Sequence, residues 1–414
     1  IDEFEVYTFG EVHRKSSALY EGLKQLGIQK GERVGVLLPN SADYIITDFS
    51  LIKGGYVRLP LNTRLTLREL EYILQDSEAT VLVYHEQFLD KVQELKGTLP
   101  LLEHYICVGS SDNTEDIPIE TFVDREPEGL PYQATQMEDN FQILYTSGTT
   151  GNPKGAVTNV LSRISSLNNV FIDELSISSN DVMVHVASLA HGGGTKVLPH
   201  FIKGAINILL PKFTPAIFLE TVQRYKVTTT WMVPTMSNML LEYPELKNYD
   251  TSSLNTIIYA GAPMPVATLK KAIDVFGNIF VQVYGLSEAP NPDLVLTKED
   301  HLLGLTEKPN ILASAGREIL NGRVSIVDSN NQPVGVNEIG EVIIKGDNIM
   351  SEDWKLPEAT EETIRNNWLY TGDLARQDEY GYIYIVDRSK DMIISGGYNI
   401  YPREIEEVLY NHPA

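Results

Sequence analysis

Residues 141–155 read FQILYTSGTTGNPKG, an apolar run followed directly by a flexible, polar one. The polar part, Tyr145–Gly155, holds three glycines, four hydroxyl side chains besides the tyrosine, and one lysine. Glycine costs conformational entropy on folding, so a loop this rich in glycine is normally kept for a task of its backbone. The composition indicates a phosphate-binding loop, because backbone N–H groups and hydroxyls are phosphate donors.

The spacing excludes one large class of phosphate loops. A Walker A loop requires G-x-x-x-x-G-K-[ST], with the lysine at the start of a helix. Here Lys154 lies between Pro153 and Gly155. Proline has no N–H for a phosphate and is excluded from a helix interior, so the P-loop NTPase interpretation fails. A plain surface hairpin is a poor match to this composition.

Composition and charge limit the remaining possibilities. The chain has 414 residues, 43% hydrophobic and 21% charged, which is ordinary for a globular protein of two or three domains. The formal net charge of −23 argues against a nucleic-acid partner, since phosphate backbones demand a basic face. We find no signal peptide, no apolar run long enough for a membrane helix, and no Cys/His cluster with zinc spacing. The single cysteine, Cys107, fits a reducing compartment, so we expect a cytoplasmic protein, with peripheral association through lipid substrates left open.

Helix and strand signals alternate along most of the chain. Capping-box spacing at Thr8–Glu11 and Thr66–Glu69 predicts two helix starts. Further helices are expected over 43–53, 214–225 and 265–276, and strands over 33–38, 56–61, 80–84, 105–108, 227–233, 253–259 and 279–284. This alternation predicts an α/β fold whose large N-terminal domain contains two layered α/β subdomains.

The last hundred residues follow another pattern. Short alternating strands over 323–327, 340–344 and 382–386 predict a small antiparallel β subdomain within 316–385. After Lys390 we expect a strand at 392–395 and a helix at 402–410, too little to bury a core of its own. We therefore expect a C-terminal domain that is largely absent, although a helix docked on the main body would fit too. The predicted division is 1–310 for the α/β subdomains, 311–389 for the β-rich subdomain, and 390–414 for a hinge and a truncated domain.

The run Tyr145–Gly155 resembles the phosphate-binding signature of the acyl-adenylate-forming superfamily, which includes acyl-CoA synthetases, peptide-synthetase adenylation domains and luciferase-like enzymes. The resemblance implies that the β- and γ-phosphates of ATP are bound by the loop, with Lys154 as a point charge. The implied loop residues are Thr146, Ser147, Gly148, Thr149, Thr150, Gly151 and Lys154.

Two further motifs of that superfamily follow in order. Tyr259-Ala260-Gly261-Ala262-Pro263 resembles its glycine-rich turn beside adenine, which implies Gly261, Ala262 and Pro263 as nucleotide contacts. Val283-Tyr284-Gly285-Leu286-Ser287-Glu288 resembles the next signature, with serine in place of the usual threonine. The resemblance implies that Tyr284 and Gly285 lie against adenine, Ser287 contacts the α-phosphate, and Glu288 holds Mg²⁺.

The ribose and hinge signatures come next. Tyr370-Thr371-Gly372-Asp373-Leu374 resembles the ribose-binding motif, in which the aspartate accepts hydrogen bonds from both ribose hydroxyls. By the same resemblance, Arg388 is a second ribose contact and Lys390 is the interdomain hinge. The resemblance covers essentially the whole chain.

The acid is expected near His191. Residues 188–195, SLAHGGGT, resemble the acyl-pocket signature, with Ala190 where an aromatic residue is usual. The three glycines predict a roomy, uncharged pocket. By the same resemblance, members that activate amino acids carry an aspartate here for the substrate's ammonium group, and its absence argues against an amino-acid substrate. We therefore expect a fatty or aryl acid, and Lys154, Ser287, Glu288 and His191 as catalytic residues.

The resemblance implies an AMP-forming acid–CoA ligase that uses ATP, Mg²⁺ and coenzyme A. The acid attacks the α-phosphorus of ATP, and a thiol then takes the acyl group from the adenylate. The superfamily's catalytic lysine of the C-terminal domain is expected beyond Ala414. An enzyme that loads a carrier-protein thiol, a luciferase-like oxygenase and a catalytically silent nucleotide-binding protein are the alternatives. A homodimer is possible, and the sequence does not name the acid.

Overall fold

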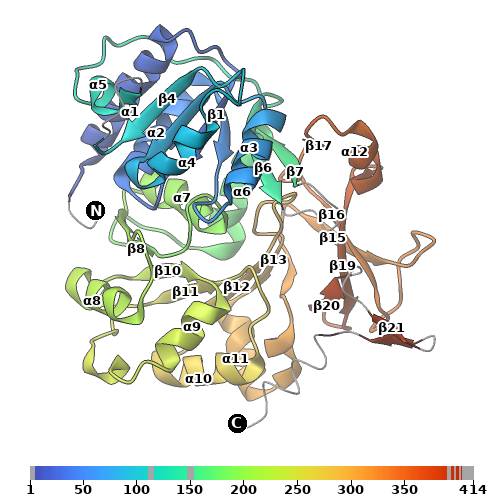
Figure 1. The fold of residues 1–414 in the computed structure, drawn as a ribbon. Helices are drawn as coiled ribbons and strands as arrows, with labels where there is room; N and C mark the ends of the chain where they lie inside the picture. The colour runs from blue at the N-terminus through green and yellow to red at the C-terminus, as the bar shows by residue number, and fades with distance from the viewer. Residues whose placement is uncertain are drawn as a thin grey trace.

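The computed structural model of the chain describes residues 5–110, 116–146, 153–388, 393–395, 398–400 and 402. Two α/β layers lie one against the other, and a smaller β-sheet stands beside both (Figure 1). Within these ranges no helix is both long and apolar enough to cross a lipid bilayer.

The first layer is an eight-stranded sheet of order β17-β7-β6-β2-β1-β3-β4-β5. Its strands are β1 (Arg33–Leu37), β2 (Val57–Pro60), β3 (Val81–His85), β4 (His104–Val108), β5 (Ile117–Pro118), β6 (Asn140–Thr146), β7 (Lys154–Asn159) and β17 (Glu352–Asp353). Strands β1 to β6 are parallel, and β7 and β17 are antiparallel to their neighbours. The helices packed with it are α1 (Phe9–Gln25), α2 (Ala42–Gly54), α3 (Leu67–Asp76), α4 (Leu89–Leu95) and α5 (Glu120–Val123).

The second layer is a seven-stranded sheet of order β14-β13-β12-β11-β10-β8-β9. Its strands are β8 (Val182–His185), β9 (Ile206–Leu209), β10 (Thr229–Met232), β11 (Thr256–Tyr259), β12 (Phe280–Tyr284), β13 (Leu294–Leu296) and β14 (Arg317–Glu318). Its principal helices are α8 (Pro215–Tyr225), α9 (Pro234–Leu241), α10 (Val266–Phe276) and α11 (Lys298–Thr306). Two more helices lie between the layers: α6 (Val160–Asn169) contacts β6 and β7 of the first sheet, and α7 (Val197–Ile202) contacts β9 and adds Val197 to the first layer's core. Because β8, β10, β11 and β12 are parallel neighbours, the loops that follow them leave one edge of the sheet.

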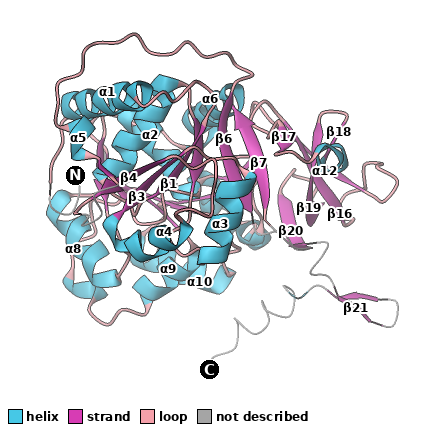
Figure 2. Cartoon of the chain, turned by 45° about the horizontal axis from the view of Figure 1, so that its top comes forward, coloured by secondary structure: helices cyan, strands magenta, loops and turns pink. Residues whose placement is uncertain are grey.

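The third sheet is antiparallel and consists of β15, β16, β18, β19 and β20. These strands are Arg323–Val327, Gly340–Lys345, Ile364–Arg365, Trp368–Gln377 and Ile383–Arg388, and the short α12 spans Pro357–Thr363. Figure 2 shows this group standing to one side of the helix-covered layers. A two-stranded pair, β21 (Ile393–Ser395) and β22 (Tyr398–Ile400), follows it.

Shared cores join the three sheets. The cluster between β1, β3 and α1/α2 also includes Leu189, Val197 and Leu209 from the second layer. Another cluster packs Ala156 of β7 and Ala289 beyond β12 against Val342 and Ile383 of the third sheet. The three sheets therefore meet around the ends of β7 and β12.

The predicted α/β class is confirmed, and so are both capping boxes: α1 begins after Thr8 and α3 after Thr66. Cys107 is fully buried in β4, as expected. Two short strands of the region predicted to be a separate antiparallel sheet pair elsewhere. β14 extends the second layer, and β17 extends the first, because each finds an open edge strand there. The predicted domain boundaries remain predictions, and the helix expected over 402–410 lies almost wholly outside the described residues.

Glu21 of α1 holds a distant segment against the helix and provides a test of this packing. Its buried carboxylate accepts N–H hydrogen bonds from Glu128 (2.6 Å), Gly129 (2.8 Å) and Leu130 (2.9 Å). Glu21→Ala leaves these donors unpaired, so we expect the free energy of unfolding in urea to fall by about 3 kcal/mol. Glu94→Ala, at an exposed position of α4, is the control and should change it by less than about 0.5 kcal/mol. Equal losses in the two variants would contradict the role of Glu21.

Candidate functional site

The glycine-rich run forms the connection of a β-hairpin. β6 and β7 pair antiparallel, with Thr146 opposite Lys154, so the predicted loop lies between two paired strand ends. Lys154 is the first residue of β7 and is half-buried. A strand, and no helix, follows Pro153, which confirms the exclusion of a Walker A loop. The predicted contacts Ser147, Gly148, Thr149, Thr150 and Gly151 lie outside the described residues.

Tyr284, Asp373 and Arg388 come together from two sheets. Tyr284 ends β12, and its hydroxyl donates a hydrogen bond to Oδ2 of Asp373 on β19 at 2.6 Å. Arg388 lies opposite Asp373 at the end of β20, and its Nε is 3.4 Å from Oδ1. The pKa of Tyr284 is raised well above its usual value by burial and by the Asp373 charge, so the phenol stays protonated and remains a donor. The predicted adenine and ribose residues thus form one group, with Asp373 buried and Arg388 exposed.

The turn after β12 places Glu288 near the third sheet. Gly285 must be small, because a Cβ there would lie 2.6 Å from Cβ of Asn291. The carbonyl of Glu288 accepts a hydrogen bond from the Met350 N–H at 2.6 Å. Burial raises the pKa of the Glu288 carboxyl, with Asp353 and Asp373 adding to the rise and Arg388 opposing it. Ser287 lies next to it, half-buried.

Glu288 has the chemistry for magnesium in a nucleotide complex. Among the described residues it forms no ion pair, and no three acidic, His or Cys side chains cluster as a metal cage. Magnesium is usually held by one or two carboxylates together with substrate phosphates and water, so a full protein cage is not required. The donor set present here therefore fits Mg²⁺ that is bound as part of a nucleotide complex.

The turn after β11 lies beside the turn after β12. Gly261 has φ +81°, a left-handed conformation that favours glycine, and Ala262 and Pro263 are exposed. Since β11 and β12 are parallel neighbours, this turn and Tyr284 occupy the same edge of the sheet. The two predicted adenine motifs are therefore adjacent in space.

His191 comes from the loop after β8, at the same edge. Its Nε2 is 3.1 Å from the side-chain nitrogen of Asn62, a residue from the loop after β2 that the sequence analysis did not single out. Desolvation by the surrounding protein and the nearby charge of Arg58 lower the pKa of His191, which favours the neutral imidazole. His191 thus joins the first layer to the second.

The glycines after His191 have close neighbours where a side chain would start, and the roomy pocket expected there remains a prediction. A Cβ at Gly192 would lie 3.0 Å from the Trp231 ring, at Gly193 2.9 Å from the Ala187 carbonyl, and at Gly194 2.1 Å from that of Leu189. The glycines therefore allow close packing at these three positions. Lys196, which follows them in the chain, forms a fully buried ion pair with Glu174.

Residues 348–354 are a second feature that the motifs did not reveal. The side-chain amide of Asn348 donates to Oδ1 of Asp293 at 2.7 Å, and the backbone N–H of Met350 donates to the Glu288 carbonyl. The backbone N–H of Trp354 donates to the Gly155 carbonyl at 2.7 Å. This segment, which we call the strap, connects the turn after β12 with the strand that follows the phosphate loop. Its sequence, NIMSEDW, has few charges and no glycine, so nothing in it indicated a functional site.

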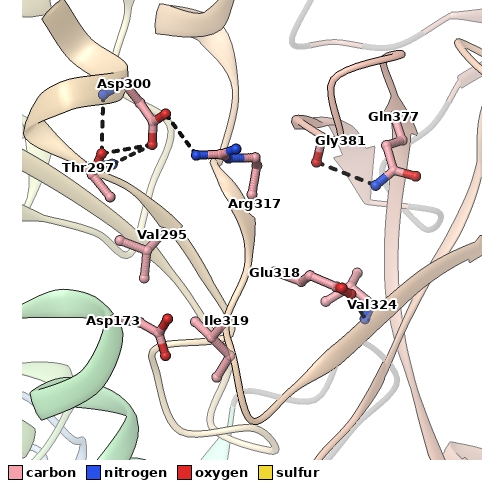
Figure 3. A pocket seen from close by; sticks show the side chains of 10 residues that line it. All are labelled: Asp173, Val295, Thr297, Asp300, Arg317, Glu318, Ile319, Val324, Gln377 and Gly381. Carbon is pink, nitrogen blue, oxygen red and sulfur yellow. Dashed lines mark hydrogen bonds and ion pairs between the residues drawn. The ribbon is translucent and has the colours of Figure 1, made fainter.

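A cavity of about 570 Å³ lies elsewhere, between the second and third sheets (Figure 3). It is lined by Asp173, Val295, Thr297, Asp300, Arg317, Glu318, Ile319, Val324, Gln377 and Gly381. Its principal carboxylate, Asp300, is already bound by Arg317 at 3.2 Å and by the Tyr382 hydroxyl at 2.6 Å. None of the predicted site residues lines this cavity, so we do not assign it to the reaction.

The buried carboxyl group of Asp293, which lies beneath the site, should make the folding stability of the protein depend on pH. Only Oδ1 has a hydrogen-bond partner among the described residues, and burial raises the pKa of this carboxyl to about 8. The unfolded carboxyl titrates near its usual value of about 4, so folding takes up a proton and stability falls as pH rises from about 4 to about 8. Asp293→Asn removes this dependence. We expect the stability of the variant, relative to the native protein, to rise by about 2 kcal/mol between pH 6 and pH 8 in urea unfolding. A difference that does not change with pH would contradict the buried, protonated carboxyl.

Comparisons with known proteins agree with this geometry. The family model of the AMP-binding enzyme matches residues 1–353. A medium/long-chain-fatty-acid–CoA ligase, FadD8, of Mycobacterium tuberculosis is 33% identical over 98% of this chain and 71% of its own length. A feruloyl-CoA synthase of Amycolatopsis sp is 36% identical over 98% of this chain and 78% of its own length.

A solved structure, that of the anthranilate CoA ligase AuaEII in complex with anthranoyl-AMP, superposes with a TM-score of 0.91 at 27% identity. It covers 100% of this chain, which covers 79% of that one. The resemblance noted in the sequence is therefore confirmed. The chain belongs to the family of AMP-binding enzymes.

Proposed function

We propose that this protein activates a fatty or aryl carboxylic acid with ATP and then forms its coenzyme A thioester, releasing pyrophosphate and AMP. The observation that carries the proposal is the convergence of Tyr284, Asp373 and Arg388 at the sheet edge that also bears Glu288 and His191. Family membership and the CoA ligases among the relatives support the reaction class.

The nucleoside is anchored away from the reacting atoms. The Tyr284 ring offers an apolar face for adenine, and the gain from stacking a base on an aromatic ring is about 1–3 kcal/mol. Asp373 is oriented by Tyr284 and Arg388, and a carboxylate can accept several hydrogen bonds, which suits it to bind ribose hydroxyls. This anchoring fixes the α-phosphate without any covalent bond to the protein.

The adenylation step depends on the positions of the reacting groups and on stabilisation of phosphate charge more than on proton transfer by acid–base groups. A carboxylate oxygen of the acid attacks the α-phosphorus in line, and the bond to pyrophosphate breaks. Lys154 meets the triphosphate, and Glu288 would hold Mg²⁺, which supplies charge neutralisation for the leaving group. In the second step the sulfur of a CoA thiolate attacks the acyl carbon, and AMP leaves with the electron pair of the broken carbon–oxygen bond. We assign to His191, whose lowered pKa favours the neutral imidazole, the role of a hydrogen-bonding group for the acid.

The class of acid rests on the relatives and on the pocket wall. Fatty acids and ferulate are the substrates printed in the relatives' names. The Trp231 ring packs on Gly192, so an aromatic surface lies beneath the loop that carries His191. This surface suits either an aryl group or an aliphatic chain.

A carrier-protein acceptor is the second candidate. A fatty acid–[acyl-carrier-protein] ligase, ScoC, of Streptomyces coeruleorubidus is 31% identical over 98% of this chain. The first half-reaction would be the same, and only the thiol would differ.

The test is a panel of fatty, aryl and dicarboxylic acids given to the full-length enzyme with MgATP, with and without CoA, measuring AMP and pyrophosphate. We expect AMP that depends on both the acid and CoA, with turnover on fatty or aryl acids. Pyrophosphate release that is equal without CoA, together with acyl transfer to a carrier protein, would favour the second candidate. Binding of ATP without turnover of any acid would overturn both.

Tyr284 separates stacking from hydrogen bonding. We expect Tyr284→Ala to weaken ATP binding about tenfold or more, because the base loses its aromatic surface. Tyr284→Phe keeps the ring and loses the bond to Asp373, so a loss of only a few-fold is expected. Calorimetric titration with ATP measures both, and Tyr243→Ala, far from the site on the segment after α9, is the control. Equal affinity in Tyr284→Ala and the native protein would contradict the adenine assignment.

A further inference from the structure

The strap, residues 348–354, connects the two charged groups proposed for the triphosphate. At one end the Met350 N–H donates to the Glu288 carbonyl. At the other, the Ser351 N–H donates to the Val157 carbonyl at 2.8 Å, and β17 pairs with β7. The strap therefore fixes the distance between the Glu288 turn and the start of β7.

The register of β17 sets the direction of Asp353. Asp353 lies opposite Ala156, and residues directly opposite in an antiparallel pair point to the same face of the sheet. Lys154, two residues before Ala156 on β7, lies on that face as the diagonal neighbour of Asp353. Ala156 packs with Ala289, the residue after Glu288. The side chain of Asp353 thus shares a face of the sheet with Lys154, and its charge also acts on the Glu288 carboxyl.

Asp353 is a buried residue whose carboxylate has no partner in the part of the chain that the structure describes. The residue is 6% exposed, its backbone N–H donates to Thr360 Oγ1 at 2.9 Å, and its backbone carbonyl accepts from the Leu356 N–H at 3.0 Å. No described residue donates to the carboxylate or forms an ion pair with it within 4.0 Å. Burial raises its pKa, and the Lys154 charge lowers it. Buried carboxylates elsewhere in the chain have partners: Glu21 accepts three N–H groups, and Asp116 is bound by Tyr84 and Lys96.

A carboxylate in a buried residue that no described residue donates to is costly, and a contact within the described fold does not account for Asp353. Lys154, Glu288 and Asp353 together carry one positive and two negative charges. The net charge of these three side chains is therefore negative. It would repel a free triphosphate and attract a divalent cation. Two carboxylates next to substrate phosphates are a usual environment for Mg²⁺.

We propose that Asp353 is a second carboxylate of the magnesium–nucleotide site, placed by the strap opposite Glu288. The site prefers the magnesium complex of ATP over free ATP because both carboxylates require the cation to offset their charge. The proposal rests on the proposed function, since the nucleotide site is the same.

The test measures the affinity for ATP by calorimetry, once with about 5 mM Mg²⁺ and once with excess EDTA. No carboxylic acid is added, so that the measured heat comes from binding and not from turnover. In the native protein we expect tight binding with Mg²⁺ and weak binding without it. In Asp353→Asn the gain from Mg²⁺ should fall about tenfold or more, while binding of free ATP is unchanged or stronger. Asp353→Glu should keep part of the gain. Glu352→Gln, the exposed neighbour on the other face of β17, is the matched control and should behave as the native protein.

The outcomes separate the two proposals. If the native protein binds no ATP under either condition, the proposed function fails. If it binds ATP with a strong gain from Mg²⁺ and Asp353→Asn retains that gain, the assignment of Asp353 is overturned while the function stands. Thermal unfolding of Asp353→Asn serves as the fold control. We expect an unfolding temperature equal to or above that of the native protein, because an unpartnered buried charge has been removed. A lower unfolding temperature would indicate a structural partner for Asp353 and contradict the proposal.

Discussion

The pairing of β17 with β7 is the constraint on which the site depends. It takes a two-residue strand from the chain between β16 and β19 and adds it to the edge of the first sheet. The strap leading to it is bound to the Glu288 carbonyl of the second layer. The three sheets, which also share core clusters, are thereby held together beside the hairpin connection that carries the glycine-rich run. This pairing and the shared core around Ala156 and Ala289 together fix the separation of Lys154 and Glu288.

The carboxylates near this pairing differ in whether protein groups bind them. Asp373 is buried yet has both Tyr284 and Arg388 as partners, whereas Glu288 and Asp353 lack ion-pair partners among the described residues. Paired and unpaired carboxylates have different uses in a nucleotide site. A carboxylate fixed by protein donors can orient ribose hydroxyls, and one without donors can accept a cation. The strongly acidic chain can bind an anionic nucleotide because salt screens the distant surface charges. Only the charges within about 10 Å of the nucleotide, including that of the metal ion, affect its binding.

The sequence predicted the fold class and the order of its elements with few errors. Local signals sufficed for that, because the capping boxes at Thr8 and Thr66 and the alternation of apolar runs act over a few residues. Long-range pairing of short strands was missed. β14 and β17 each contain two residues, and their pattern carries no information about which sheet edge they join. The close neighbours of the glycines after His191 were not visible in the sequence for a similar reason, since a glycine that permits close packing and one that opens a pocket look the same in sequence.

By itself, then, the sequence determined the α/β architecture, and it predicted the phosphate loop and the nucleotide contacts, because these depend on residue type and local spacing. Only the tertiary structure decided that Tyr284 bonds Asp373, that His191 meets Asn62, and that Asp353 shares a sheet face with Lys154. Those relations depend on register and on which strand edges meet, which are set by packing across hundreds of residues. The chemistry of each side chain follows from its residue type, but its neighbours in space come from distant parts of the sequence.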